Sequence, residues 1–409
     1  MDETRRGRSV NSMGSTGSMG STGSTGEGGG DATVAAARAG DESAFAALVE
    51  RHRGELRVHC YRMLGSFDEA EDLVQETFLR AWRKLGAFEG RSTFRAWLYR
   101  IATNACLDVL DGRARRVLPH HLAGPSDPSS APVSRTDIAW MQPFPDRLLE
   151  PAAPGETEPD SVAVTRETIE LAFLAAIQHL PPRQRAVLIL RDVLGWPAKQ
   201  TATLLEGSVA SVNSALQRAR ATLRDHLPER RLDWAPSAEP TERERAVLRR
   251  YMEAMERADP AAVADLLAED VRTQMPPWPM WFRGRDTVVA SLAASWDAGS
   301  PDHVGRFRMI PVRANRQPAV ATYVRRPGEP AHTPFAISLL WIEGDRIAEI
   351  VAFHDPGLFA AFALPATPAP PVLPSSPSSP LPKAPDTTSP EVPATLLGVP
   401  PGVPPATRR

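Results

Sequence analysis

Acidic residues gather at one place in the chain, where their spacing suggests a binding surface. They crowd the start of a helical segment: Asp68, Glu69, Glu71, Asp72 and Glu76. Negative charge at a helix start complements the helix dipole, so these residues could simply cap and solubilise a helix. The alternative is an acidic surface that binds a basic protein partner.

Arginines gather further along, beside aromatic side chains. The aromatic residues are Phe94, Trp97 and Tyr99, and the arginines around them are Arg91, Arg95, Arg100, Arg113, Arg115 and Arg116. A basic edge interleaved with aromatic rings can follow a phosphate backbone and stack unpaired bases. The alternative is an arginine-rich face that only meets solvent.

The elements that position these residues are predicted to be helices. Apolar residues recur at helical spacing over 45–63, 73–85 and 94–105, which predicts three amphipathic helices in a compact bundle. Cys60 and Cys106, the only cysteines, fall on these apolar stripes. We therefore expect them to be small core residues rather than part of a disulfide framework or a zinc cluster.

The run DEAEDLVQETFLRAWRKLGAFEGRSTFRAWLYRIATNACLD, residues 68–108, resembles the second conserved domain of extracytoplasmic-function sigma factors. These belong to the sigma-70 superfamily of bacterial RNA polymerase initiation subunits. The resemblance implies that the acidic helix binds the clamp helices of the largest polymerase subunit through Asp72, Gln75, Glu76 and Phe78. It also implies that the Trp-containing helix opens and reads the minus-10 promoter element, with DNA contacts from Trp97, Arg100, Asn104, Asp108, Arg113, Arg115 and Arg116.

A second helical pattern spans residues 166–227. A short helix, a turn at Gly207 and a longer helix predict a helix-turn-helix, whose second helix enters the major groove. Residues 179–227 resemble the fourth sigma domain, which binds the minus-35 element. In that family Gly directly follows the Leu that ends the first helix, whereas here Glu206 intervenes, which affects the geometry of the turn. The exposed positions expected to contact DNA are Ser211, Asn213, Ser214, Gln217, Arg218 and Arg220.

The segment between these two blocks, residues 117–160, is rich in Pro, Ser and Asp and is expected to be a flexible linker. Its apolar part, residues 138–145, is an exception that we expect to dock, either in the polymerase cleft or on another domain of this chain. His120 and His121 have no other candidate ligand nearby, so no metal site is predicted. Nothing in the sequence indicates a cofactor.

Residues 242–364 form a third block, with helices first and strands after, which predicts an α+β domain. Strands are expected at 306–312, 319–324, 335–342 and 346–353, and a short helix at 262–268. The segment 251–288 resembles the cone-shaped fold of nuclear transport factor 2, ketosteroid isomerase and SnoaL-like cyclases. Because this block follows the two sigma-like domains, the resemblance implies that the chain belongs to the subgroup of extracytoplasmic-function sigma factors with a SnoaL-like C-terminal extension.

The cone implied by this resemblance would be lined by Met275, Trp278, Trp281, Phe282, Phe353, His354 and Asp355. Enzymes of this fold use an Asp or His as general base, and the candidates here are Asp270, His354 and Asp355. Catalysis, the sensing of a small-molecule ligand and a regulatory contact with the sigma domains or polymerase all stay open. We favour the regulatory contact, since spacing alone does not bring a base and an oxyanion donor together.

Composition limits the remaining choices. Residues 7–30 repeat Ser, Thr and Gly, and residues 365–409 are rich in Pro, so both ends are expected to be disordered. The net charge of −2 argues against binding nucleic acid by overall positive charge, but it leaves local basic patches open. No stretch approaches the ~18 to 20 apolar residues of a membrane span, so we expect a soluble, cytoplasmic protein without a membrane partner.

Together these patterns predict a multidomain chain: two all-α sigma domains, the second with a helix-turn-helix, and a C-terminal α+β cone domain. The expected boundaries are 1–30 for the disordered N-terminus, 31–116 and 161–228 for the sigma domains, 117–160 for the linker, 242–364 for the cone and 365–409 for the tail. The expected function is non-enzymatic, that of a sigma factor whose C-terminal domain regulates it in cis. The rivals are a helix-turn-helix regulator that works without polymerase and a ligand sensor or enzyme centred on the cone.

Overall fold

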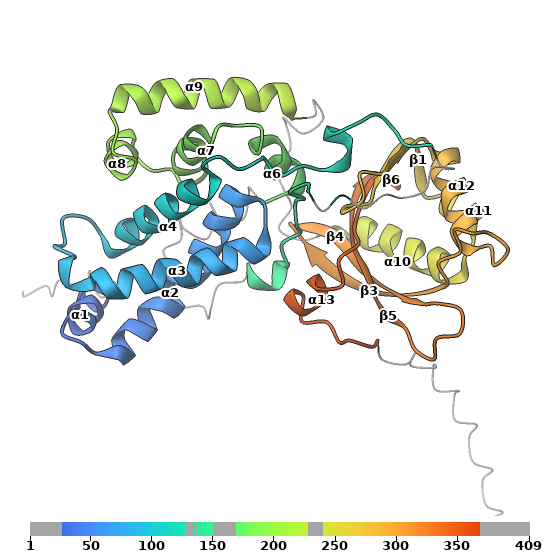
Figure 1. Cartoon of the computed structure of the whole chain (residues 1–409), viewed down its shortest axis with the longest axis horizontal. Coiled ribbons are helices and arrows are strands. Elements are labelled where there is room, and N and C mark those ends of the chain that lie inside the picture. The colour runs from blue at the N-terminus through green and yellow to red at the C-terminus, as the bar shows by residue number, and fades with distance from the viewer. Residues whose placement is uncertain (1–26, 128–134, 136, 150–168, 228–239, 369–409) are drawn as a thin grey trace, which may run out of the picture. The chain divides into compact units, whose positions relative to one another are not determined.

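A computed structural model describes residues 27–127, 135, 137–149, 169–227 and 240–368 of the 409-residue chain (Figure 1). The expectations for residues 1–26, 128–134, 136, 150–168, 228–239 and 369–409 lie outside these described residues. Among the helices of the described ranges, none is both long enough and apolar enough to cross a membrane.

The first helical block contains helices α1 (Glu27–Arg38), α2 (Glu42–Leu64), α3 (Phe67–Lys84) and α4 (Phe94–Leu110). The Asp41 carboxylate caps α2, and Gly65, at a φ of 70°, ends it in the left-handed conformation that glycine adopts without strain. The block begins at Glu27, so the expectation of disorder up to residue 30 is wrong at its end. Local composition could not predict this start, because α1 is held by tertiary packing: its residue Ala37 is buried in the core of this block.

The second helical block contains α6 (Leu171–Ile177), α7 (Pro182–Leu188), a π-helical turn (Ile189–Val193), α8 (Ala198–Leu204) and α9 (Val209–His226). Proline at the first position of α7 costs no hydrogen bond, because the first amides of a helix have no partner within it. Helices α8 and α9 form the predicted helix-turn-helix. In its turn Glu206 adopts a positive φ of 53°, the conformation in which a side chain is strained.

The C-terminal domain has helices α10 (Glu242–Arg257), α11 (Pro260–Ala264), α12 (Arg285–Trp296) and α13 (Leu358–Ala361) around one sheet. The sheet order is β2-β1-β6-β5-β4-β3. Its strands are β1 (Leu267–Gln274), β2 (Trp281–Arg283), β3 (Arg306–Ala314), β4 (Gln317–Arg325), β5 (Thr333–Glu343) and β6 (Arg346–Phe353).

Four of these strands were predicted and two were not. The helix expected over residues 262–268 is wrong in its second half, since α11 ends at Ala264 and β1 starts at Leu267. The cause is non-local, because β1 is held by parallel pairing with β6, a strand about eighty residues away in sequence. Strands β3 and β4 are joined by a two-residue turn of Asn315 and Arg316, whose φ values of 53° and 61° suit the twist of a hairpin.

Both faces of this sheet are covered. Val320, Leu340 and Ile350 share a core with α10 on one face. Their neighbours Ala321, Leu339 and Val351, which point the other way because strand side chains alternate, belong to the core of the helical blocks. The second face is therefore packed on the rest of the chain rather than exposed.

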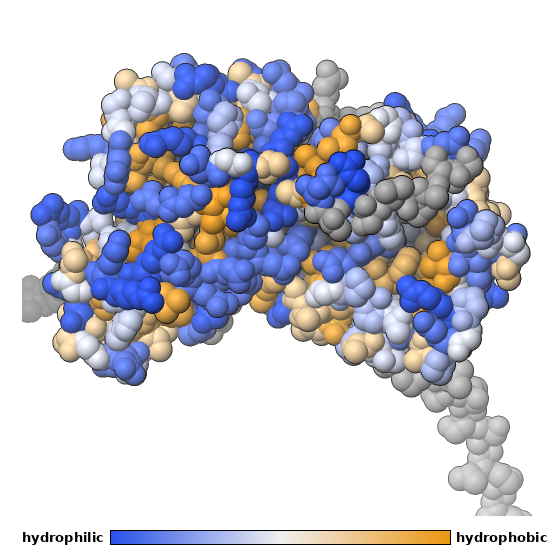
Figure 2. Space-filling view, viewed as in Figure 1, coloured by the Kyte–Doolittle hydropathy of each residue, from blue (hydrophilic) through white to orange (hydrophobic). Residues whose placement is uncertain are grey.

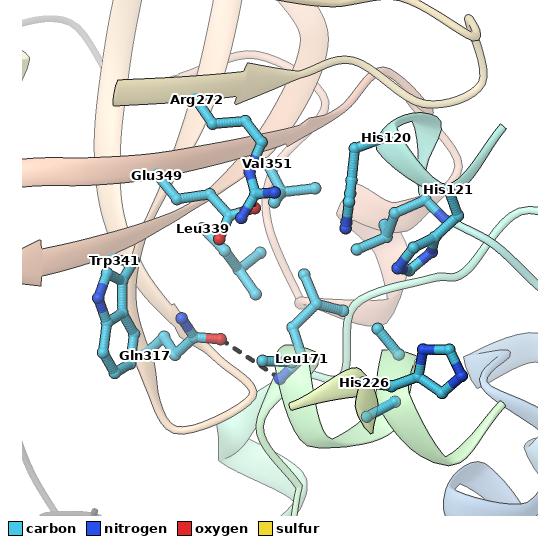
Figure 3. Close-up of a pocket in the computed structure, with 14 residues that line it drawn as sticks. His120, His121, Leu171, His226, Arg272, Gln317, Leu339, Trp341, Glu349 and Val351 are labelled. Carbon is cyan, nitrogen blue, oxygen red and sulfur yellow. Dashed lines mark hydrogen bonds and ion pairs between the residues drawn. The ribbon is translucent and has the colours of Figure 1, made fainter. Parts of the chain in front are cut away.

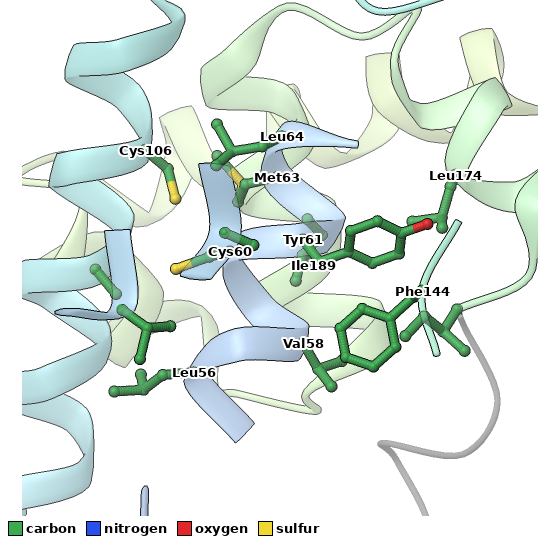
Figure 4. Close-up of a cluster of buried hydrophobic side chains, with 14 of the residues drawn as sticks. Leu56, Val58, Cys60, Tyr61, Met63, Leu64, Cys106, Phe144, Leu174 and Ile189 are labelled. Carbon is green, nitrogen blue, oxygen red and sulfur yellow. The ribbon is translucent and has the colours of Figure 1, made fainter. Parts of the chain in front are cut away.

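Part of the linker is also packed in this core, which corrects the expectation that all of residues 117–160 is flexible. Val117, Leu118, Met141 and Phe144 are each at most 4% exposed. Figure 4 shows Phe144 beside Tyr61 of α2, with Leu174 of α6 nearby, and the two rings lie 4.9 Å apart between centroids. The interpretation that residues 138–145 dock on another part of the same chain is confirmed, because Met141 and Phe144 are buried there, which removes their apolar surface from water.

Candidate nucleic-acid interface and the domain junction

The face of α3 proposed to meet a protein partner combines charged and apolar residues. Asp72 and Gln75 are exposed, and Glu76 accepts a hydrogen bond from Arg80 at 2.7 Å. Phe78 instead lies in the core, at 7% exposed, while its neighbour Leu79 is 50% exposed. Leu79 was missed by sequence reasoning, although an apolar residue outside the buried stripe of a helix was a signal that could have revealed it.

The acidic start of α3 is engaged inside the chain. Glu69 Oε1 lies 3.1 Å from Arg113 and 2.8 Å from Arg116, just beyond α4. The Asp68 carboxylate accepts a hydrogen bond of 2.7 Å from the amide of Gln142 in the linker. Some of the acidic residues and arginines that form separate groups in the sequence therefore make ion pairs with one another in this structure.

Helix α4 carries four of the seven residues expected at the minus-10 element, and Arg113, Arg115 and Arg116 follow its end at Leu110. Trp97 is half-buried, with ring centroids 5.1 Å from Phe88 and 5.6 Å from Phe94. Asn104 is half-buried and Asp108 is exposed, with its carboxylate 3.7 Å from Arg80. Trp97, Asn104 and Asp108, none of them fully buried, recur at helical spacing and therefore lie along one side of α4.

Helix α9 presents its polar side to solvent. All six residues expected to contact DNA are exposed: Ser211, Asn213, Ser214, Gln217, Arg218 and Arg220. Ser211 also closes the capping box of α9 with Ser208, and Arg220 makes a two-fold hydrogen bond to Asp192 at 2.8 and 2.6 Å. Val212, Leu216 and Ala219 form the buried stripe that orients this polar side outward.

The helix-turn-helix contacts the block that contains α4. Arg100 of α4 donates a hydrogen bond of 2.6 Å to Glu206 in the turn, and the Trp196 ring packs at a tilt against Tyr99, 5.1 Å between centroids. Arg185 of α7 is buried and donates to the carbonyl oxygen of Met63 in α2. Figure 2 shows hydrophobic surface between α4 and α9, framed by hydrophilic residues.

Asn315 joins three parts of the chain at one point. Its side-chain amide donates to the Tyr61 hydroxyl at 2.9 Å and to the carbonyl of Ile169 at 2.6 Å. Its side-chain oxygen accepts from the backbone N–H of Phe144 at 2.8 Å. Tyr61 in turn donates to the carbonyl of Gln142 at 2.7 Å, and burial raises its pKa, so the hydroxyl stays a donor. The C-terminal domain thus holds the linker against both helical blocks.

Four histidines meet near the same junction, two from the linker and two from the second helical block. Ring centroids are 3.9 Å apart for His120 and His121, 5.1 Å for His121 and His179, and 3.8 Å for His179 and His226. Figure 3 shows His120, His121 and His226 around the same pocket as Arg272 and Glu349 of the sheet, with His120 the nearest of the three to Arg272. The four histidines come from segments far apart in the sequence, so the sequence analysis did not predict that they lie close together.

The environment favours the neutral form of two of these rings, His121 and His179. Burial, with the neighbouring charge of His120, lowers the pKa of His121 to about 3. Burial, with the charge of Arg115, lowers the pKa of His179 to about 4. Within the described part of the chain, no set of three or more His, Cys, Asp and Glu side chains is arranged to hold a metal ion.

The cone residues divide between two environments. Met275 and Phe282 pack with the α10 core, whereas Trp281 points to the linker and donates to the carbonyl of Ala123 at 2.8 Å. The Trp278 ring packs at a tilt against His354, 4.6 Å between centroids, and burial lowers the pKa of His354 to about 3.

The candidate bases are not assembled around a common point. Asp270 is exposed, and the Asp355 carboxylate accepts from the backbone N–H of Gly357 at 2.9 Å. His354 lies against Phe335, 4.7 Å between centroids, among aromatic rings. These contacts bring no oxyanion donor together with a base.

Comparison with known proteins assigns each block. Family models match for Sigma-70 region 2 over residues 48–116, for Sigma-70, region 4 over 170–223, and for the SnoaL-like domain over 248–350. Two sigma-70 regions followed by a SnoaL-like domain define an RNA polymerase sigma factor with a C-terminal extension.

One curated relative identifies the class of sigma factor more specifically. The chain is 43% identical over 344 residues to the ECF RNA polymerase sigma factor SigG of Mycobacterium tuberculosis, covering 82% of this chain and 89% of that protein. It is 30% identical to SigW of Bacillus subtilis, covering 46% and 91%. The crystal structure of the M. tuberculosis extracytoplasmic function sigma factor SigJ is similar over 79% of this chain and 100% of that one, with 21% identity and a TM-score of 0.49.

The chain belongs to the extracytoplasmic-function sigma factors. Members of this family bind the RNA polymerase core and promoter DNA, so the protein is a transcription initiation factor rather than an enzyme. The predicted family, with its C-terminal SnoaL-like domain, is confirmed.

Proposed function

We propose that this sigma factor directs promoter-specific initiation and that its SnoaL-like domain restrains it in cis, by holding the two sigma domains in a closed arrangement. The single observation that carries the restraint is the Asn315 junction, where one side chain of the C-terminal domain hydrogen-bonds α2, the linker and the segment before α6. Buried hydrogen bonds of this kind are costly to break without replacement.

The spacing of promoter elements supports a closed arrangement that must open. The minus-10 and minus-35 positions differ by about 25 base pairs, roughly 85 Å of duplex at 3.4 Å each. In this structure Arg100 of the minus-10 helix touches Glu206, in the turn before the minus-35 helix, at 2.6 Å. Because both helices cannot reach their elements while this contact persists, the second sigma domain has to move away from the first.

The proposed roles follow the exposed faces. Asp72, Gln75 and Glu76 of α3, with Leu79 beside them, would bind the clamp helices of the polymerase. On α4, Trp97, Asn104 and Asp108 would read the minus-10 element, with Arg100 and the arginines at 113, 115 and 116 on phosphates. The exposed residues of α9 from Ser211 to Arg220 would read the minus-35 element.

Run-off transcription tests both parts of the proposal. The full chain with polymerase core and a promoter library should initiate at promoters of one sequence class, and the double variant Gln217→Ala, Arg218→Ala should lose them. Arg249→Gln, an exposed change on α10, serves as the control. If no promoter in the library supports specific initiation, the proposal that this protein directs promoter-specific transcription is refuted.

The restraint has a separate readout in the same assay. Asn315→Gly, which opens the junction, should raise the yield from the same promoters. An unchanged or lower yield, with the variant still folded by circular dichroism, would contradict cis restraint and leave the initiation activity standing.

A further inference from the structure

Val209, the first residue of α9, is an apolar side chain that the fold leaves largely in water. It is 43% exposed, and no other large apolar side chain in the described segment 169–227 is exposed. The packing of α9 does not depend on it, because the buried stripe of this helix consists of Val212, Leu216 and Ala219. The core of the second helical block therefore does not explain why a valine stands at this position.

Local helix formation does not explain the valine either. The Ser208 hydroxyl caps α9 by accepting a hydrogen bond from the backbone N–H of Ser211 at 3.1 Å, and the Ser211 hydroxyl accepts one from the N–H of Ser208 at 3.1 Å. A β-branched side chain loses rotamer freedom in a helix, so valine favours a helix less than alanine does. The exposed side chain of Val209 is thus free to make a contact outside the chain.

Val209 lies in line with polar residues that are expected to contact DNA. Side chains four positions apart share a face of a helix, so Val209, Asn213 and Gln217 form one row along α9. Asn213 and Gln217 are both exposed. In a helix-turn-helix, the N-terminal residues of the second helix reach the base edges in the major groove. Because Val209 begins this row, it is placed at the end of α9 that enters the groove.

The start of α9 offers hydrocarbon rather than hydrogen-bond donors. Ala210, beside Val209, is also exposed and apolar, and the first turn of the helix carries no charged residue. The Ser211 hydroxyl donates its proton to the carbonyl oxygen of Ser208 at 2.7 Å, so it has no proton left for a base. The first side chain of the row with a polar group for a base edge is therefore that of Asn213.

The major groove contains one apolar base-edge substituent that fits such a surface, the C5-methyl group of thymine. The other groups on the base edges donate or accept hydrogen bonds, and they lose their water without compensation when hydrocarbon covers them. We propose that Val209 is a specificity-determining residue that packs on the C5-methyl group of a thymine in the minus-35 element. This inference rests on the proposed function, since it requires α9 to enter the major groove of that element.

Deoxyuridine tests this contact, because it pairs with adenine as thymidine does and lacks only the methyl group. The polymerase core with the full chain is bound to a promoter that supports specific initiation, and each thymine of its minus-35 element, on either strand, is replaced in turn by uracil. At one position the replacement should weaken binding about fourfold, the effect of losing one buried methyl group. A minus-35 element without thymine on either strand, or one in which every replacement leaves binding unchanged, would overturn the proposal.

Two variants assign the methyl contact to a side chain. With Val209→Ala, the difference between thymine and uracil should disappear, because alanine is too short to reach the methyl group; α9 should stay folded, since alanine favours a helix. Leu122→Ala, which shortens a linker side chain that is also 43% exposed, should keep the difference. A difference that persists in Val209→Ala, or that disappears in both variants, would refute the contact.

Failure of this contact and failure of the proposed function are distinguishable. If the holoenzyme initiates at specific promoters and uracil is tolerated throughout the minus-35 element, the initiation activity stands and the Val209 contact is refuted. If no promoter supports specific initiation, both proposals are refuted. If Val209→Ala weakens binding equally with thymine and uracil while a thymine preference remains, another side chain reads the methyl group and the assignment to Val209 is wrong.

Discussion

Replacing Asn315 by glycine removes one side chain that joins the C-terminal domain to the linker and keeps the turn. Glycine adopts the φ of 53° at this position more readily than asparagine does, so the hairpin should survive. Three side-chain hydrogen bonds are lost, to Tyr61, Ile169 and the N–H of Phe144. The buried Phe144 N–H and Ile169 carbonyl would then lack these partners.

The magnitude follows from the three bonds. At about 1 kcal/mol each, the closed junction loses about 3 kcal/mol relative to its open form, part of which the relief of backbone strain returns. The equilibrium for opening should rise about a hundredfold. Hydrogen exchange measures this directly: the amides of Gln142 and Phe144 should exchange about a hundredfold faster, whereas those of β4 should not change.

A neighbouring residue supplies the control. Arg316→Gly relaxes a φ of 61° in the same turn, and its backbone N–H still reaches Asp146. It should not accelerate exchange at Phe144. Exchange at Phe144 that stays at the wild-type rate in Asn315→Gly, or that rises equally in Arg316→Gly, would refute the central place given to the Asn315 side chain.

Three further predictions follow from other contacts. Glu206→Gly should be more stable than Glu206→Gln by about 1 kcal/mol in urea unfolding, because both lose the ion pair with Arg100 but only glycine relieves the positive φ; equal stabilities would argue against strain in this turn. Arg185→Met should lower the unfolding free energy by about 3 kcal/mol, since the carbonyls of Ile177, Leu180 and Met63 lose their donor, and Arg185→Lys should rescue only part of this; full rescue in a thermal melt would show that charge alone matters. His121 and His179 have pKa values lowered to about 3 and 4, so the unfolded chain binds more protons below pH 6.5, and stability should be complete above that pH and fall as the pH drops toward 4; urea midpoints at several pH values should show a shallower fall in His179→Gln, and an identical fall would remove His179 from the explanation.

Much of the fold and the exposed face of α9 could be predicted from the sequence. Helical spacing around Leu216 and Ala219 predicted the buried stripe of α9, and the six residues on its other side are exposed as expected. The strands of the C-terminal hairpins were predicted from runs of β-branched and apolar residues. Such patterns are local, because the period of a helix or strand decides which side chains share a face.

Strand β1 and the burial of Phe78 could not be predicted from local patterns, because both depend on contacts with distant parts of the chain. Residues 267–274 carry charged side chains at Glu269 and Asp270 and become a strand through pairing with β6. Phe78 sits on a helix whose sequence suggested an outward role, yet the packing of α2 and α4 makes it part of the core. Neither outcome is encoded within one element.

The sequence by itself determined the three folded blocks, the helix-turn-helix and the sigma-factor family, since each depends on the order and spacing of residues along the chain. Only the tertiary structure decided that the second face of the sheet is buried, that Asn315 ties the linker to Tyr61, and that Arg100 meets Glu206. These contacts join residues 106 or more positions apart, and their energies arise from removing apolar and polar groups from water together. The periodicity of a single helix or strand does not show which distant surfaces will pack together and be buried.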